Sequence, residues 1–389
     1  MKPAQKFRAA CYTIEGLNSF ATVIYFNYLY FLFRDRFGFD NKENLALAAL
    51  IGLIYTVASW QAGRFAQRYG NFTALKIGFV VMAAGLFAGS QLGSVTGQIV
   101  IACVVNVGMC FIWPVLEALV SEGTGAARAV GIYNITWALA NALAYFVGGA
   151  IIQSFGYQSV FYVPLVFILV QLALVCWIEK IHTHHVAPEA VAPLPPEPHR
   201  PSPGQARAFQ QMAWLANPFA YIAINTLLAV MPGIAAHFQL STSLAGFVCS
   251  LWCFARVAAF IGLWQWTRWH YRFRWLATAF ALLMLSFVGI LSTPSLVLLL
   301  VAQMVFGLAI GLIYYSSLFY SMDASDTKSA HGGIHEAAIG LGNCLGPGIG
   351  AASLQLFPQY TNNGVVAVGA LLLCGFGGLW WLQWQARGR

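Results

Sequence analysis

A few charged and titratable side chains lie inside long apolar stretches of the sequence. Glu15 lies within the first stretch, and Arg256 lies in the middle of a later one. A charge at the centre of a helix in lipid costs roughly 2.5–3.5 kcal/mol, so such residues persist where they face a bundle interior, a partner or water. A carboxylic acid in such a place can bind and release a proton. These residue types therefore predict proton coupling and recognition of a charged solute.

Three further groups join Glu15 as candidates for proton coupling. Glu15, Glu336, His335 and Glu117 are the predicted coupling residues, because acids and histidines exchange protons. Glu15 has an alternative role as an interhelical hydrogen-bond acceptor, and Glu117 has one as a residue that snorkels or pairs with a loop cation. His331 and His335 share a helix face at a spacing that suits a metal, but no third ligand is visible on that face. No metal site is predicted.

Arg256 is the main candidate for contact with a substrate. Arginine stays charged in proteins, so it needs a carboxylate partner or an anionic substrate. The alternative is a structural pair with Glu15 or Glu336. Polar and aromatic residues of other apolar stretches could line the same site, although hydrogen bonding and packing between helices are their default roles. The predicted substrate-binding residues are Arg256, Asn18, Asn141, Asn343, Trp137, Trp252, Tyr314 and Tyr315.

The amino-acid composition indicates the class of protein to which the chain belongs. Of 389 residues, 59% are hydrophobic and 8% are charged, whereas soluble proteins carry about 25% charged residues. This excludes a soluble enzyme, a disordered scaffold and a nucleic-acid module. A bilayer helix needs about 20 apolar residues, so the chain holds roughly a dozen. No phosphate-binding GxxxxGK[ST] motif is present, and neither a cofactor nor an enzymatic activity is predicted.

Twelve apolar segments predict an all-α membrane protein with twelve transmembrane helices in two pseudo-symmetric six-helix bundles. The segments lie near residues 10–33, 44–62, 74–93, 97–120, 128–152, 158–178, 213–235, 243–266, 275–292, 295–319, 330–354 and 363–384. A tract that holds seven of the fifteen prolines separates the sixth segment from the seventh, and such a tract is typical of an extended linker. The predicted units are therefore a bundle at 1–178, a linker at 179–212 and a bundle at 213–389.

The distribution of lysine and arginine predicts the orientation. With the N-terminus inside, most basic residues lie on the cytoplasmic side, and only Arg34, Arg36 and Lys42 lie in an external loop. Both termini are therefore expected in the cytoplasm. The same bias explains the net charge of +8 without a nucleic-acid partner. Compact loops and short tails are typical of a bacterial inner membrane protein.

The two halves resemble each other at an offset of 202 residues. Asn141 then lies over Asn343, and the segment 131–134 lies over 333–336. Parallel repeats of this kind are related by an axis along the membrane normal, as in several transporters. The repeat-related pair is expected to border a central cavity.

The loop after the second segment resembles the G-x-L-a-D-R-x-G-R signature of the major facilitator superfamily. It reads Gly63-Arg64-Phe65-Ala66-Gln67-Arg68-Tyr69-Gly70-Asn71. The resemblance, together with twelve segments and a central linker, implies the fold of that family and a gating motif at Gly63, Gln67, Arg68 and Gly70. In the family, the acidic residue of the signature helps to latch the two halves. Gln67 stands in its place and supplies no ion pair.

These observations predict a secondary transporter that rocks its halves around a midplane site. Proton coupling and a small organic solute, anionic or amphipathic, are favoured because acids, histidines and Arg256 are the embedded groups. One alternative is a drug-type proton antiporter that exports cationic amphiphiles. Another is a lipid-handling or sensor protein of the same fold that does not pump. The expected partners are a small-molecule substrate, protons and the lipid bilayer, and a monomer is expected.

Overall fold

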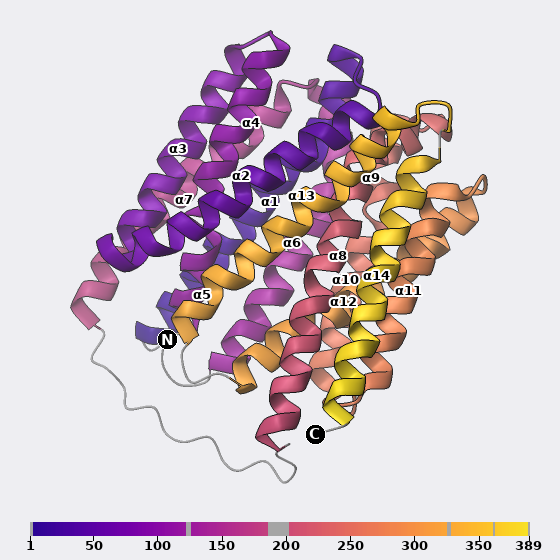
Figure 1. Ribbon diagram of the computed structural model, residues 1–389. Coiled ribbons are helices and arrows are strands. Elements are labelled where there is room, and N and C mark those ends of the chain that lie inside the picture. The colour runs from indigo at the N-terminus through magenta and orange to yellow at the C-terminus, as the bar shows by residue number, and fades with distance from the viewer. Residues whose placement is uncertain (1–2, 122–125, 186–201, 325–327, 361, 388–389) are drawn as a thin grey trace.

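The computed structural model describes residues 3–121, 126–185, 202–324, 328–360 and 362–387, and every regular element in these ranges is an α-helix. Figure 1 shows the helices as one elongated bundle. They are α1 (Pro3–Phe37), α2 (Asn41–Tyr69), α3 (Asn71–Gln91), α4 (Val95–Cys110), α5 (Trp113–Val120), α6 (Ala126–Phe155), α7 (Ser159–His185), α8 (Pro203–His237), α9 (Thr242–Cys249), α10 (Leu251–Gln265), α11 (Phe273–Ser292), α12 (Leu296–Ala324), α13 (Lys328–Leu356) and α14 (Asn363–Arg387).

Two pairs of short helices each form one membrane-length segment, which gives twelve segments in the described residues. The α4–α5 break lies next to Pro114, whose ring nitrogen cannot donate to the helical ladder. The α9–α10 break lies at Ser250. In the described part of the chain, ten of these segments are long and apolar enough to span a membrane. The structure confirms the predicted all-α membrane fold.

Local sequence signals determine where several helices begin. Asp40 and Glu43 form a capping box at α2, in which each side chain accepts a hydrogen bond from the other residue's backbone N–H. Ser202 and Ser241 cap α8 and α9 by accepting from the N–H three residues ahead. These caps fix the ends of helices that line the space between the two halves.

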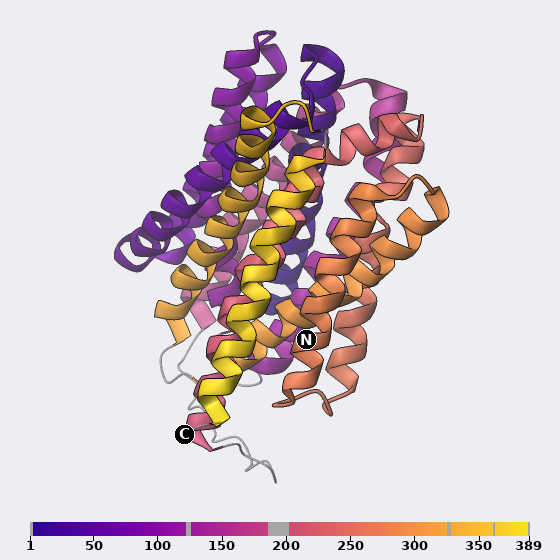
Figure 2. The same cartoon turned by 45° about the vertical axis from the view of Figure 1, so that its right-hand side comes forward.

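Helices α1–α7 form the N-terminal half, and α8–α14 form the C-terminal half. Helix α7 continues to His185 and α8 begins at Pro203, so both helices extend into the predicted linker, whose central residues 186–201 are outside the described ranges. Figures 1 and 2 show both chain ends at the same end of the bundle, which we call the terminal end; the opposite end is the distal end. Helix α2 packs along α13, and α6 packs against α9 and α10.

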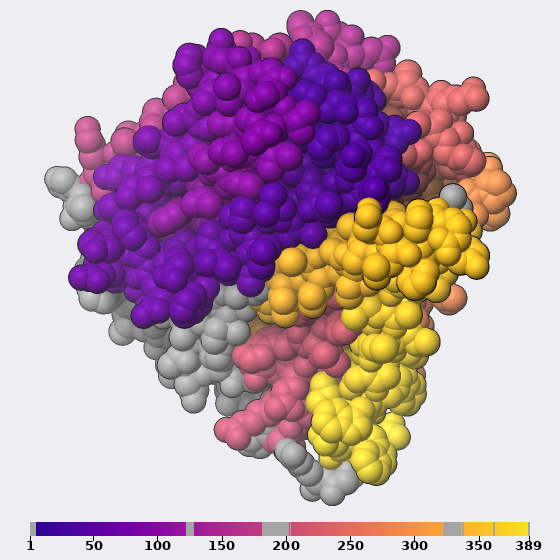
Figure 3. Space-filling view, turned by 45° about the horizontal axis from the view of Figure 1, so that its top comes forward, coloured from indigo at the N-terminus to yellow at the C-terminus, as the bar shows by residue number. Residues whose placement is uncertain are grey.

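The two halves are in close contact at the distal end. A Cβ atom added to Gly149 of α6 would overlap the carbonyl oxygen of Thr242 in α9. Beside this contact, the backbone N–H of Ser243 donates to Oε1 of Gln153 at 3.0 Å. Figure 3, turned toward this end, shows α13 lying against the N-terminal half. A glycine is therefore required where α6 meets α9.

Candidate substrate cavity

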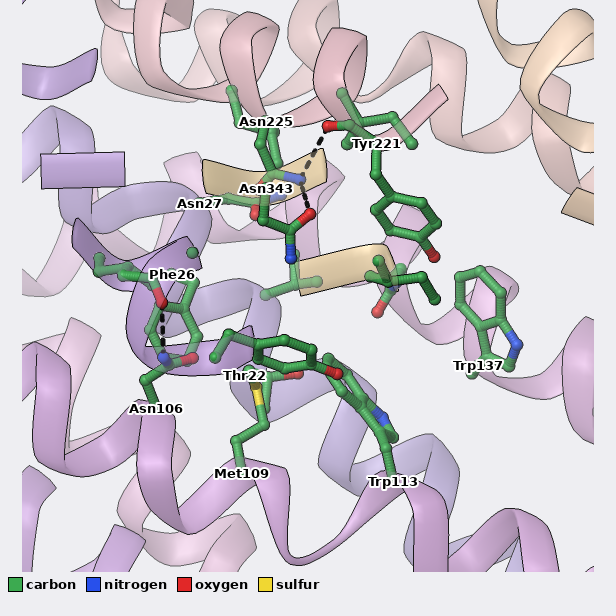
Figure 4. A pocket seen from close by; sticks show the side chains of 18 of the residues that line it. Thr22, Phe26, Asn27, Asn106, Met109, Trp113, Trp137, Tyr221, Asn225 and Asn343 are labelled. Atoms are coloured by element: carbon green, nitrogen blue, oxygen red, sulfur yellow. Dashed lines mark hydrogen bonds between the residues drawn. The ribbon is translucent and has the colours of Figure 1, made fainter. Parts of the chain in front are cut away.

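A cavity of about 200 Å³ lies between the two halves and is lined by helices from both. Figure 4 shows its side chains, which converge from several helices. Nine of the predicted site residues line it: Glu15, Glu117, Trp137, Asn141, Trp252, Arg256, Tyr314, Glu336 and Asn343. The wall is mostly apolar or aromatic, with a small set of ionisable and amide groups, as is typical of a small-molecule site.

Glu15 is fully buried on α1 and accepts three hydrogen bonds. Ser19 Oγ donates to Oε1 at 2.8 Å, Trp113 Nε1 donates to Oε1 at 3.1 Å, and Tyr133 OH donates to Oε2 at 2.9 Å. The break before α5 places Trp113 beside α1, and α6 supplies Tyr133. Glu15 is thus an interhelical acceptor, as one interpretation of the sequence predicted. The donors also stabilise a negative charge at this site once a proton has left.

Glu336 of α13 accepts a hydrogen bond from the hydroxyl of Tyr55 in α2. This contact joins the C-terminal half to the N-terminal half, because the two helices pack along each other. Glu117 of α5 also lines the cavity, and no hydrogen bond to its carboxylate is found among the described residues. Three carboxylates therefore share one cavity, and one of them bridges the halves.

Arg256 of α10 is 5% exposed and lies between two indole rings. Its guanidinium carbon is 4.6 Å from the ring centroid of Trp137 in α6 and 5.0 Å from that of Trp252 in its own helix. Nε has no hydrogen-bond acceptor, and no carboxylate of a described residue lies within 4.0 Å of the guanidinium. The pair with Glu15 or Glu336, considered from the sequence, is not formed.

Amide side chains complete the polar part of the wall. Asn225 Nδ2 donates to Asn343 Oδ1 at 2.5 Å and to the backbone oxygen of Tyr221 at 3.2 Å (Figure 4). Asn141 Oδ1 is buried without a donor. The repeat-related residues Asn141 and Asn343 thus face the same cavity, one from each half.

The chain matches the profile of the Major Facilitator Superfamily across residues 9–347. It belongs to this family. Membership of this family makes it an integral membrane transporter rather than an enzyme. No match among curated proteins is significant.

Solved structures with the same fold are transporters of distant sequence. A peptide transporter, POT, solved as a point mutant in complex with sulfate, has a TM-score of 0.75 at 14% identity, over 97% of this chain and 94% of that chain. A bacterial homologue of the human lysosomal transporter Spinster, inward-facing and unoccupied, scores 0.65 at 13% identity, over 99% and 96%. The human organic anion transporter MFSD10 (TETRAN) scores 0.69 at 13% identity, over 97% and 100%. At these identities the likeness shows the fold alone.

The signature residues of the superfamily lie where α2 ends, at the terminal end of the bundle. Gly63 lies within α2, and Gly70 links α2 to α3 with a φ of +92°, a conformation that favours glycine. Gln67 and Arg68 are exposed, and Gln67 makes no hydrogen bond to another described side chain. Their gating role stays a prediction.

Of the predicted substrate and coupling residues whose side chains the structure describes, two lie outside the cavity wall. Asn18 is fully buried on α1, and neither of its amide atoms has a hydrogen-bond partner in the described part of the chain. Tyr315 lines a second, neighbouring cavity. The side chain of His335, like that of His331, lies outside the described residues.

The sequence analysis missed the donors that hold the carboxylates, namely Trp113, Tyr133 and Tyr55. Trp113 precedes Pro114, and a helix break at a proline was the one available sign that its ring could point across the bundle. Tyr133 lies in the repeated segment 131–134, but the repeat partner is a histidine and gave no sign of a shared role. Tyr55 has no local signal, because its partner is 281 residues away.

Proposed function

We propose that this transporter is a proton-coupled carrier of a small organic anion. The observation that supports the proposal is the environment of Arg256, a buried guanidinium between two indoles with no carboxylate beside it. The indole faces attract the cation but offer no anionic acceptor. A carboxylate, sulfonate or phosphate of a substrate would supply that acceptor in the two-pronged geometry that a guanidinium prefers.

The ionisable groups of the cavity supply the coupling. The wall holds the guanidinium of Arg256 and the carboxylates of Glu15, Glu117 and Glu336. With all three acids protonated the wall has a formal charge of +1, and with all three ionised it has a charge of −2. An anion binds the protonated wall more strongly, so protons and anion move in the same direction. The carrier is therefore a symporter in this proposal.

The size of the cavity favours a small solute over the two alternatives. Sites for drug-sized ligands measure about 300–1,000 Å³, and this cavity measures about 200 Å³ in the observed state. The excess of carboxylates is the one feature that favours a cation-exporting antiporter, because three ionised acids would attract a cationic amphiphile. In that case substrate and protons would compete for the same groups.

We further propose that the terminal end faces the cytoplasm of a bacterial cell and that the protein works as a monomer in the inner membrane. The lysine and arginine bias supports the orientation. Under this orientation the close contact of Gly149 with α9 lies on the external side of the cavity.

Ligand-induced thermal stabilisation of the purified protein tests the proposal. Organic anions, sugars, cationic drugs and lipids are screened at pH 5.5 and 7.5, because a ligand stabilises the state it binds. We expect an anion to stabilise the protein more strongly at pH 5.5. Arg256→Gln should lower the affinity for that anion by roughly ten- to a hundredfold, as expected for the loss of a hydrogen bond to a charged group. The control is Arg207→Gln, at an exposed arginine that does not line a cavity, and it should leave the affinity unchanged.

Two results would decide against this proposal. Unchanged anion affinity in Arg256→Gln would remove the substrate assignment. A cationic ligand that binds better at pH 7.5 and is lost in Glu15→Gln or Glu336→Gln would support the antiporter instead.

A further inference from the structure

A second cavity, of about 320 Å³, lies at the terminal end between the two halves. Its walls come from the first turns of α6 in the N-terminal half and from α10, α12 and the α10–α11 turn in the C-terminal half. It shares no lining residue with the central cavity. The lining residues are Arg128, Val130, Gly131, Asn134, Leu263, Trp264, Thr267, His270, Tyr315, Leu318 and Phe319.

Asn134 gives this cavity a buried hydrogen-bond donor without an acceptor. The residue is 1% exposed, and its Oδ1 already accepts a hydrogen bond from Trp137 Nε1 at 2.8 Å. Its Nδ2 has no partner among the described residues. A buried unsatisfied donor is costly in a folded protein, and an acceptor atom supplied by a ligand would remove that cost. Nδ2 of Asn134 can therefore donate to such a ligand.

Two further residues of the wall, Arg128 and Trp264, can only donate hydrogen bonds, whereas Thr267, His270 and Tyr315 can both donate and accept. Arg128 presents an exposed guanidinium at the start of α6, and the indole nitrogen of Trp264 can donate but not accept. The Trp264 ring lies beside Gly131, whose added Cβ would be 3.7 Å from that nitrogen. None of the eleven described lining residues is acidic. The positive charge of Arg128 and the free donor of Asn134 therefore favour a ligand that accepts hydrogen bonds and carries negative charge.

The remainder of the wall is apolar and aromatic. Leu263 and Leu318 supply aliphatic surface, and the Phe319 ring stacks on His270 with a centroid distance of 3.9 Å. Such a wall accommodates a flat or apolar body rather than a fully hydrated inorganic ion. The volume is within the range of about 300–1,000 Å³ found for small-molecule sites.

We propose that this cavity is a second binding site, for an organic anion with an apolar or aromatic body, bound by Arg128, Asn134 and Trp264. The site is distinct from the central cavity and does not depend on the role of Arg256. A layer of aromatic rings separates the two sites: Trp137 lies 5.3 Å from Tyr314 and 5.7 Å from Phe260. Trp137 contacts both Asn134, in the wall of the second cavity, and Arg256, in the wall of the central cavity, so a single residue connects the two walls.

Equilibrium binding of radioiodinated 4-iodobenzoate to the full-length protein in phosphatidylcholine nanodiscs tests the site. Empty nanodiscs provide the background. In an Arg256→Gln protein, which lacks the central anion partner, we expect saturable binding to remain. Adding Arg128→Gln to this protein should lower the affinity of the residual binding by about tenfold or more. Adding Trp264→Phe instead should lower it by a smaller factor, because only one neutral donor is lost. Both side chains are exposed, and so neither change threatens folding. Arg207→Gln is the matched control for loss of one exposed positive charge and should have no effect.

The outcomes separate the second site from the proposed function. Binding that disappears with Arg256→Gln alone overturns the second site and leaves the central one. Residual binding that ignores both Arg128→Gln and Trp264→Phe also overturns it. Binding that depends on Arg128 but not on Arg256 supports the second site and contradicts the central anion site.

The same experiment identifies the source of the anion. If phosphatidylglycerol added to the nanodiscs displaces the probe in an Arg128-dependent way, the natural occupant is an anionic lipid headgroup with its chain. If it does not displace the probe, the occupant is a free solute.

Discussion

Replacing Glu15 by glutamine should uncouple transport from protons while leaving the fold intact. The amide oxygen can keep the two bonds that Oε1 accepts from Ser19 and Trp113. The amide nitrogen then faces Tyr133, whose hydroxyl can rotate to accept instead of donate. All three hydrogen bonds survive in this arrangement, so we expect the free energy of unfolding to change by less than about 1 kcal/mol.

Leucine at the same position provides the contrast. It leaves the indole N–H of Trp113 and the hydroxyl of Tyr133 without an acceptor in a buried site, at about 1–3 kcal/mol for each unsatisfied group. Ser19 escapes this cost, because a serine hydroxyl in a helix can bond to a carbonyl of the preceding turn. Glu15→Leu should therefore lower the free energy of unfolding by about 2–6 kcal/mol, and Glu15→Gln should not.

Two assays in parallel separate the effects. Thermal unfolding in detergent ranks the stabilities, with Glu15→Leu melting well below Glu15→Gln. In liposomes, Glu15→Gln should exchange labelled for unlabelled substrate across the membrane but fail to accumulate it with a pH gradient. Gradient-driven accumulation at the wild-type level would refute the coupling role of Glu15. Equal melting temperatures for the two variants would refute the hydrogen-bond argument.

Three further changes test the contacts between and around the halves. Tyr55→Phe removes the donor to Glu336 and should shift the equilibrium away from the observed state by about 1 kcal/mol, roughly fivefold, seen as a changed distance distribution between spin labels on α2 and α13. Gly149→Val must push α9 away, since the new side chain would overlap the Thr242 carbonyl oxygen; at an overpacking cost of about 1–3 kcal/mol, spin labels at the distal end should report a longer distance, and an unchanged distance would contradict the close packing. Lys76→Gln breaks the ion pair between Lys76 and Glu179, in which the two side chains are 36% and 32% exposed. Melting temperature and transport rate should change little, because surface ion pairs are worth about 0–1 kcal/mol.

The transmembrane architecture was accessible from the sequence because it depends on local properties. Hydropathy over about 20 residues marks a span wherever it lies, and the helix caps and Pro114 act within one turn. For the same reason the embedded charges were identified: Glu15, Glu336 and Arg256 stand out against apolar neighbours without any knowledge of their partners.

The partners of those charges were not accessible, because they depend on how distant helices meet. Charge alone suggested an anionic substrate or a carboxylate of the protein beside Arg256, but it did not indicate that the packing of α6 on α10 places the Trp137 ring there. The hydroxyl of Tyr55 reaches Glu336 because α2 packs along α13, a contact that neither segment encodes alone. The unpaired Nδ2 of Asn134 could likewise be recognised only in the structure, where Trp137 Nε1 donates to Oδ1 and no acceptor of a described residue faces Nδ2.

Helix α6 extends further from Trp137 toward the distal end than toward the terminal end. At about 1.5 Å per residue, Gly149 lies about 18 Å from Trp137 toward the distal end, and Gly131 lies about 9 Å from it toward the terminal end. A rigid tilt about Trp137 would carry the two ends in opposite directions, with the distal arm travelling about twice as far as the terminal arm. Lifting Gly149 off α9 would therefore press Gly131 toward Trp264 and squeeze the second cavity. A single tilt of α6 would then open the contact at the distal end and close the cavity at the terminal end in the same movement.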